Sequence, residues 1–154
     1  DKFQRVIVKA AANDNYPFSY GGSGAHIRDA YVHHLSQIAD LRLDERSTLS
    51  CILYLNGEYW GVYEMREKTD DHDFTDYYYD QDKNNLQYLK TWGQFNTWSE
   101  YGGVQAQTDW DNFVNLVATN PMVNQVNYNQ AKSEYNMGSL IDYFLLNAYV
   151  VCQD

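Results

Sequence analysis

The chain has 154 residues, of which 44% are hydrophobic, so it is long enough and apolar enough to bury a core within one domain. Its 11 basic and 21 acidic residues give a net charge of −10, and such an acidic surface repels phosphate backbones and anionic lipid headgroups. Nucleic acids and membrane surfaces are therefore excluded as expected partners, and no apolar run reaches the roughly 18 residues of a membrane span.

The first part of the chain is predicted to form a strand, a loop and a helix. Residues 6–8 are a β-branched run that ends at Lys9, which is typical of a buried strand. Residues 11–24 are rich in Asn, Gly and Ser and are expected to form a loop. A helix follows, because apolar residues and one histidine recur at the spacing of a single helical face: Ile27, Ala30, Tyr31, His34, Leu35 and Ile38. This stripe predicts that His34 lies in the core.

A β-hairpin is predicted in the middle of the chain. Residues 48–55 are strand-like, and Asn56-Gly57 follows them directly. Because both central residues of a tight hairpin turn need a positive φ, an Asn-Gly pair between two strand-like runs is a strong hairpin signal. The returning strand is expected from about residue 58 to 66.

The second half of the chain is expected to be mainly helical. A short helix should end near the tyrosines at 77–79, and residues 85–90 could form a further short strand. Thr108 is expected to cap the next helix. Residues 124–135 are expected to form a polar helix. The last helix is predicted to bury an apolar face made by Met137, Leu140, Ile141, Phe144, Leu145 and Ala148.

No residue spacing in the chain predicts a metal site. Cys51 and Cys152 form no CxxC pair and lie in apolar runs, so they are expected to be two buried thiols, and their disulfide state stays open. His33 and His34 are adjacent and would point about 100° apart on a helix, so they cannot share one metal ion. The aspartates at 70–82 lack the spacing of a calcium loop and are expected to form a charged face.

Three segments together resemble the CotH kinase family, whose members are spore coat protein H-like and related to atypical protein kinases. Residues 52–70, ILYLNGEYWGVYEMREKTD, resemble its L-N-G-E-Y-x-G-x-Y segment and the acidic E-x-x-D that follows. Residues 25–31 resemble its arginine–acid helix, and residues 140–154 resemble the helix that enters its catalytic loop. The resemblance spans roughly residues 5–90 and 137–154.

The predicted elements also follow the order of a protein kinase fold from its third strand to its catalytic loop. The resemblance therefore implies an α+β, protein-kinase-like fold that is partial. Residues 1–90 would carry the small-lobe sheet, its helix and the hinge region, and residues 91–154 would begin the helical lobe. The chain is expected to be a single incomplete, truncated domain that ends at the catalytic loop, so the activity would belong to the complete protein and not to this piece alone.

The resemblance implies four site residues. Lys9 would bind the nucleotide phosphates and Asp29 would orient it; the alternatives are a solvated strand-end lysine and an exposed helix face. Glu67 lies where a kinase has the hinge that contacts its nucleotide, mainly through backbone groups, or else it belongs to a charged loop. Asp154 would orient or deprotonate the attacking hydroxyl.

Two functions remain open on these grounds. The resemblance implies a transferase that uses ATP and Mg²⁺ to phosphorylate protein Ser or Thr, with the metal ligands beyond this chain. The alternative is a non-catalytic adhesion or assembly module on the same scaffold, in which Trp92, Trp98 and Tyr101 could bind a sugar or a protein. The resemblance places the protein outside the cell, at the cell surface or in the spore coat, with a nucleotide and a protein substrate or coat protein as partners.

Overall fold

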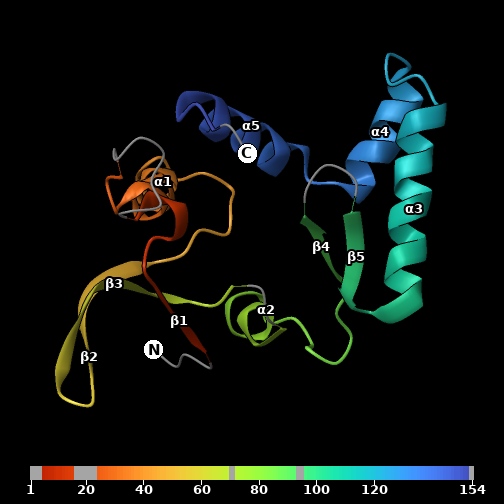
Figure 1. The fold of residues 1–154 in the computed structure, drawn as a ribbon. Helices are drawn as coiled ribbons and strands as arrows, with labels where there is room; N and C mark the ends of the chain where they lie inside the picture. The colour runs from red at the N-terminus through yellow and green to blue at the C-terminus, as the bar shows by residue number, and fades with distance from the viewer. Residues whose placement is uncertain (1–4, 16–23, 70–71, 93–95, 153–154) are drawn as a thin grey trace. The chain divides into compact units, whose positions relative to one another are not determined.

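The computed structural model describes residues 5–15, 24–69, 72–92 and 96–152, and its fold is α+β (Figure 1). The chain divides into two compact units, one formed by Asp1–Thr69 with Gly138–Asp154 and the other by Asp70–Met137. The lobe boundary expected at residue 90 stays a prediction. Among the described residues, no helix combines the length and the apolar character that crossing a membrane requires.

The first unit contains a three-stranded antiparallel sheet in the order β1-β3-β2. Its strands are β1 Val6–Lys9, β2 Thr48–Leu55 and β3 Glu58–Glu67, so β3 is central and pairs with both neighbours. Asn56 and Gly57 join β2 to β3 with φ angles of 53° and 85°, the left-handed region that a tight hairpin turn requires. The predicted strands and the predicted hairpin are confirmed in position. The expectation that residues 6–8 form a buried strand is wrong, because Val6 and Val8 of this edge strand are exposed.

The α1 helix of this unit, Arg28–Ile38, lies where it was predicted, but its apolar stripe is not buried. Ile27, Tyr31, His34 and Ile38 are exposed, whereas Ser36 is buried and its hydroxyl donates a hydrogen bond of 3.0 Å to Glu45. The prediction that His34 lies in the core is therefore wrong. The polar side of α1 is the inner one because its side chains find hydrogen-bond partners there.

The α5 helix, Met137–Tyr149, is also confirmed in position but not in the face that it buries. Its apolar residues Ile141, Phe144 and Leu145 are exposed, and its buried residue is Asp142. This carboxylate accepts hydrogen bonds from Arg42, at 2.9 Å from the backbone N, 2.7 Å from Nε and 2.9 Å from Nη2. The helix is thus attached to the rest of the unit through an ion pair rather than through its apolar stripe.

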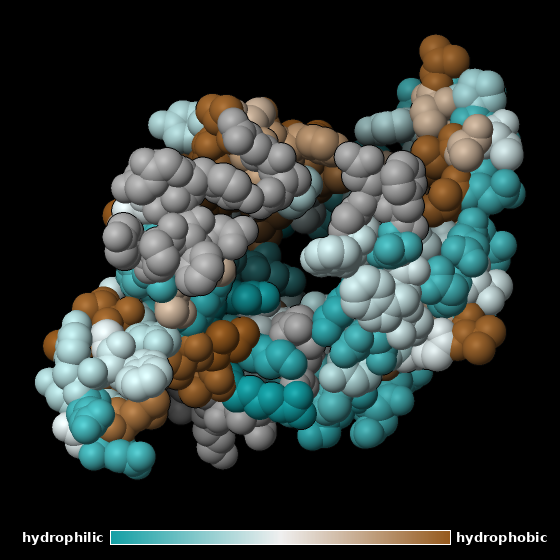
Figure 2. Space-filling view, viewed as in Figure 1, coloured by the Kyte–Doolittle hydropathy of each residue, from teal (hydrophilic) through white to brown (hydrophobic). Residues whose placement is uncertain are grey.

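Further apolar side chains of the first unit are exposed as well. Figure 2 shows apolar atoms at the surface of the β2–β3 hairpin, where Ile52, Tyr54, Trp60 and Val62 are exposed. Cys152 is exposed and Cys51 is half-buried, so the expectation of two buried thiols is wrong.

The second unit combines a two-stranded sheet with three helices. The elements in chain order are α2 His72–Tyr79, β4 Tyr88–Trp92, β5 Asn96–Tyr101, α3 Gly103–Thr119 and α4 Gln125–Glu134. The α2 and α4 helices are confirmed, and β4 lies close to the expected strand. The sequence did not predict β5, which pairs antiparallel with β4.

The α3 helix begins earlier than predicted, at Gly103, with Gly102 as its N-cap residue at a φ of 93°. Thr108 lies inside the helix, where its hydroxyl donates a 2.9 Å hydrogen bond to the backbone oxygen of Val104. A threonine inside a helix can bond in this way to the carbonyl four residues earlier, so it does not have to mark the start. The predicted cap at Thr108 is wrong.

Candidate functional site

The strands β1 and β3 place three charged side chains on one face of the first sheet. Lys9 lies opposite Glu64, and Ile7 lies opposite Arg66. Opposite residues of an antiparallel pair project to the same face, as do residues two apart along a strand. Lys9, Glu64 and Arg66 therefore share this face, and the two residues of β3 stand on the central strand with a neighbour on each side.

Asp29 reaches the same group from the first turn of α1, and Asp14 fixes where that helix begins. Asp14 accepts hydrogen bonds from the backbone N of Ala25 at 2.8 Å and of Arg28 at 3.0 Å, and its Oδ1 lies 3.1 Å from Arg28 Nε. Burial alone would raise the pKa of Asp14, but these hydrogen bonds and the charge of Arg28 lower it. An ionised Asp14 thus anchors the N-terminus of α1 and sets the position of Asp29.

Four side chains meet on this face: Lys9, Asp29, Glu64 and Arg66, hereafter the charge cluster. Lys9 Nζ donates a hydrogen bond to Asp29 Oδ2. Arg66 Nη2 donates to the same oxygen at 3.2 Å and also donates to Glu64 Oε2. Two cations and two carboxylates therefore balance one another.

The charge cluster runs from the interior of the unit to its surface. Glu64 and Arg66 are each only 3% exposed, whereas the side chains of Lys9 and Asp29 are 32% and 46% exposed. A ligand arriving from solvent would therefore meet Lys9 and Asp29, and the buried Glu64–Arg66 pair supports them from below.

The cations of the cluster keep Asp29 ionised. Partial burial would raise the pKa of its carboxyl, but the hydrogen bonds and positive charges of Lys9 and Arg66 lower it. One turn further along α1, His33 accepts a hydrogen bond at Nδ1 from the backbone N of Arg46, 3.2 Å away. Burial lowers the pKa of His33, so this imidazole is neutral and leaves the cluster's charge balance unchanged at neutral pH.

The structure brings two of the four predicted site residues together and separates a third from them. Lys9 and Asp29 form an ion pair, as their proposed roles require. Glu67 is the last residue of β3 and pairs with Val6, so the alternation of the strand places it on the opposite face from Arg66 and Lys9. Asp154 lies outside the described residues. The functional roles of all four stay predictions.

Sequence reasoning missed Glu64 and Arg66. A signal was present, because Glu64-Met65-Arg66 puts two opposite charges two residues apart in a strand that an apolar run precedes. Charged residues are almost never fully buried unless they are paired. Glu64 and Arg66, two opposite charges on the same face of a predicted strand, were therefore candidates for an ion-pair network.

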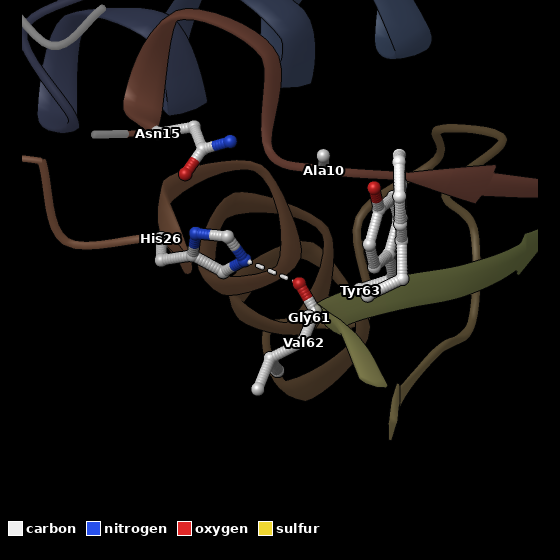
Figure 3. Close-up of a pocket in the computed structure, with 7 residues that line it drawn as sticks. Ala10, Asn15, His26, Gly61, Val62 and Tyr63 are labelled. Atoms are coloured by element: carbon white, nitrogen blue, oxygen red, sulfur yellow. Dashed lines mark hydrogen bonds between the residues drawn. The ribbon is translucent and has the colours of Figure 1, made fainter. Parts of the chain in front are cut away.

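A pocket of about 230 Å³ opens beside the cluster's strands and is drawn in Figure 3. It is lined by Ala10, Asn15, His26, Trp60, Gly61, Val62 and Tyr63. Within it, Nε2 of His26 lies 3.1 Å from the backbone oxygen of Val62. Because a carbonyl oxygen can only accept, this nitrogen carries the proton and donates it. Among the described residues, none of the predicted site residues lines this pocket.

The described residues fit a phosphate better than a metal ion. Lys9 is a half-exposed cation at a strand end, which is the type of group that binds phosphate oxygens. No group of three His, Cys, Asp or Glu side chains that could hold a metal occurs in the described part of the chain. Both carboxylates of the charge cluster already accept hydrogen bonds from cations, so they are not suited to bind Mg²⁺.

The family model described as CotH kinase protein matches residues 11–154. The match covers most of the chain, including Asp29, Glu64 and Arg66, and it begins two residues after Lys9. No curated protein and no solved structure matches the chain at a significant level.

Proposed function

The chain belongs to the CotH kinase family, and from this premise we propose that it forms the phosphate-binding part of an ATP- and Mg²⁺-dependent protein kinase. The family membership supports a kinase-like function. We propose in addition the nucleotide, the metal and the Ser or Thr acceptor. The observation that supports them is the Lys9–Asp29 ion pair between the end of β1 and the first turn of α1. This pair presents a positioned cation to solvent above a buried charged support.

The roles of the side chains follow from their chemistry. Bound ATP supplies the γ-phosphoryl group, and the acceptor hydroxyl oxygen bonds to its phosphorus as the bond to ADP breaks. Lys9 neutralises phosphate oxygens, and Asp29 holds its ammonium beside the site until the anion arrives, so that only a short movement of the lysine side chain is needed. Asp154 takes the hydroxyl proton. The metal ligands are expected outside the described residues.

Phosphate transfer from ATP labelled on its γ-phosphate tests this proposal. The complete protein is incubated with casein as a Ser- and Thr-rich acceptor, as the unsubstituted form and as Lys9→Met and Asp154→Asn. Both substitutions should reduce labelling by about 100-fold or more, because positioned acid–base groups and charge clamps each contribute on that scale. Lys83→Met is the matched control, since it removes one positive charge from an exposed ion pair with Asp73 in the other unit.

Circular dichroism checks that each variant is folded before its labelling is compared. Labelling that persists in both Lys9→Met and Asp154→Asn would remove the proposed function. Labelling that falls equally in Lys83→Met would show a response to net charge rather than to the site.

We further propose that the protein works at the cell surface or in the spore coat and that its substrate is a protein of the same compartment. The support is the family membership alone. Immunogold labelling of intact cells and spores tests it, and a signal confined to the cell interior would contradict it.

A second function, a non-catalytic adhesion module, is favoured by one surface of the second unit. The register of β4 and β5 pairs Trp92 with Asn96 and Lys90 with Trp98, so both tryptophans project from the same face of this hairpin, and both are exposed. Trp98 Nε1 donates to Glu100 at 3.2 Å, and Lys90 binds the same carboxylate at 3.1 Å. Exposed aromatic rings on one face, beside fixed polar groups, suit a saccharide.

Binding to immobilised cell-wall polysaccharide tests this second function. Trp92→Ala should weaken binding, whereas Lys9→Met should leave it unchanged because Lys9 lies in the other unit. Undiminished binding of Trp92→Ala together with Trp98→Ala would exclude the saccharide role of this face.

A further inference from the structure

Arg66 is the most unusual side chain of the charge cluster. Its side chain is only 2% exposed, and its Nε has no hydrogen-bond partner among the described residues. A buried donor without a partner is unfavourable, and such groups are rare outside sites where they have a role. The contacts of Nη2 to Glu64 and Asp29 therefore hold the guanidinium in an orientation that leaves its Nε–H without a hydrogen-bond acceptor among the described residues.

The contacts of Asp29 show what this orientation achieves. A single oxygen, Oδ2, accepts hydrogen bonds from both Lys9 and Arg66. If Lys9 were its only cation, moving the lysine toward a phosphate would leave a half-buried carboxylate without a counter-charge, which is costly. With Arg66 in contact, the carboxylate keeps one cation whatever Lys9 does.

We propose that Arg66 is a positioning residue of the phosphate site, which holds the charge of Asp29 so that Lys9 can turn from that carboxylate to an anionic oxygen of the nucleotide. Glu64 fixes Arg66 from below and balances its charge. This inference rests on the proposed function and adds to it a residue pair that the sequence did not single out.

The key variant is the double substitution Glu64→Gln with Arg66→Met. It removes both buried charges at once, so no ion is left without its partner in the interior, and pairs replaced in this way often fold normally. The double substitution Lys83→Met with Asp73→Asn, which likewise removes one positive and one negative charge from an ion pair, is the matched control. Folding is verified by hydrogen exchange of the β1 and β3 amides.

Two ligands separate a positioning role from a merely structural one. Calorimetry measures the affinity for ATP with Mg²⁺ and for adenosine, which lacks phosphate. We expect the double variant to bind ATP about tenfold more weakly, whereas its affinity for adenosine stays the same. A structural disturbance of the site would weaken both ligands alike, and that result would overturn the inference.

A second variant decides the question if the double variant does not fold. Arg66→Lys keeps the buried charge on Glu64 paired, but the ammonium of its shorter side chain cannot take the position from which Arg66 Nη2 contacts both carboxylates. It should weaken ATP binding, and the effect should vanish in an Asp29→Asn background, where Lys9 has no carboxylate to leave. An effect that persists there would overturn the inference.

The outcomes also separate this inference from the proposed function. ATP binding that the unsubstituted protein shows and the variants retain in full would remove the role of Arg66 alone. No ATP binding by the unsubstituted protein would remove the proposed function, and the role of Arg66 with it.

Discussion

The two compact units of the chain have interiors of opposite character. In the first unit the most buried side chains are mainly polar or charged: Asp14, Ser36, Glu64, Arg66 and Asp142. In the second unit they are mainly apolar: Phe74, Leu86, Ala106 and Ala131. Among the described residues, the exceptions are the buried Ala11 of the first unit and the buried Thr75 of the second.

The two kinds of interior have different effects: one mainly stabilises its unit, and the other mainly fixes the orientation of side chains. Apolar burial is non-directional and responds little to pH or to the loss of a single partner group. A buried ion pair adds little net stability, but removing one partner is strongly unfavourable, so it fixes orientation more than it stabilises. The buried ion pairs of the first unit therefore fix the positions of the site's side chains. The apolar interior of the second unit is less sensitive to changes in protonation.

The largest effect is expected from Arg66→Met in the first unit. It leaves Glu64 as an unpaired buried carboxylate, which should lower the free energy of unfolding by about 3–5 kcal/mol. Hydrogen exchange should show faster opening of β1 and β3 while α3 and α4 keep their protection. Adding Glu64→Gln should restore most of the loss, and no restoration would contradict the ion-pair interpretation.

A smaller effect is expected from Ala106→Leu in the second unit. Ala106 is fully buried in α3, so the added methylenes overpack its surroundings and should lower the free energy of unfolding by about 1–3 kcal/mol. Protection should fall in α3 and not in β3. The exposed Val104 of the same helix provides the control Val104→Leu, which should change stability by less than about 0.5 kcal/mol.

Asp142→Asn tests the ion pair that attaches α5. Hydrogen bonds from Arg42 lower the pKa of Asp142 to about 2, below its ordinary 3.8. A lowered carboxyl pKa contributes stability that is present above pH 3.8 and is lost as the pH falls through about 2. The variant should be less stable than the unsubstituted protein at neutral pH and equal to it in strong acid.

The loss in Asp142→Asn should stay below that in Arg66→Met, because Arg42 is 62% exposed and solvent screens its charge. Thermal denaturation followed across the pH range measures it. Asp111→Asn, which removes a carboxylate from the exposed surface of α3, is the control and should show no such pH-dependent difference. A constant difference at every pH would contradict the charge-based explanation.

The smallest effect is expected from His33. Burial lowers its pKa below 6.5, so the folded state disfavours its protonation, and its contribution to stability is present above pH 6.5 and is lost as the pH falls through the lowered value. His33→Asn, which keeps an acceptor for the backbone N of Arg46, should flatten the decline of stability in mild acid. The exposed neighbour supplies the control His34→Asn, which should leave the pH profile unchanged. Equal profiles for His33→Asn and the unsubstituted protein would contradict this.

Local patterns in the sequence determined most of the secondary structure, and the family resemblance pointed to two of the four residues of the charge cluster. The β-branched run before Lys9, the Asn-Gly turn and the period of α1 each act over a few residues, so a single sequence suffices to locate them. Local patterns placed Lys9 at a strand end and Asp29 on a helix, and the resemblance to the CotH kinase family then singled them out as site residues.

Only the tertiary structure decided which face of each helix lies inside and which charges share the site. The apolar periods of α1 and α5 predicted buried stripes, but Asp29 and Asp142 found partners in distant segments and Ser36 found one just beyond the end of α1, at Glu45. These contacts set the inner faces. Likewise β5 is a polar strand that pairs with β4 through contacts such as Thr91–Thr97, which no local pattern encodes. Glu64 and Arg66 belong to the same class, because burying a charge depends on a partner that strand register and helix packing supply.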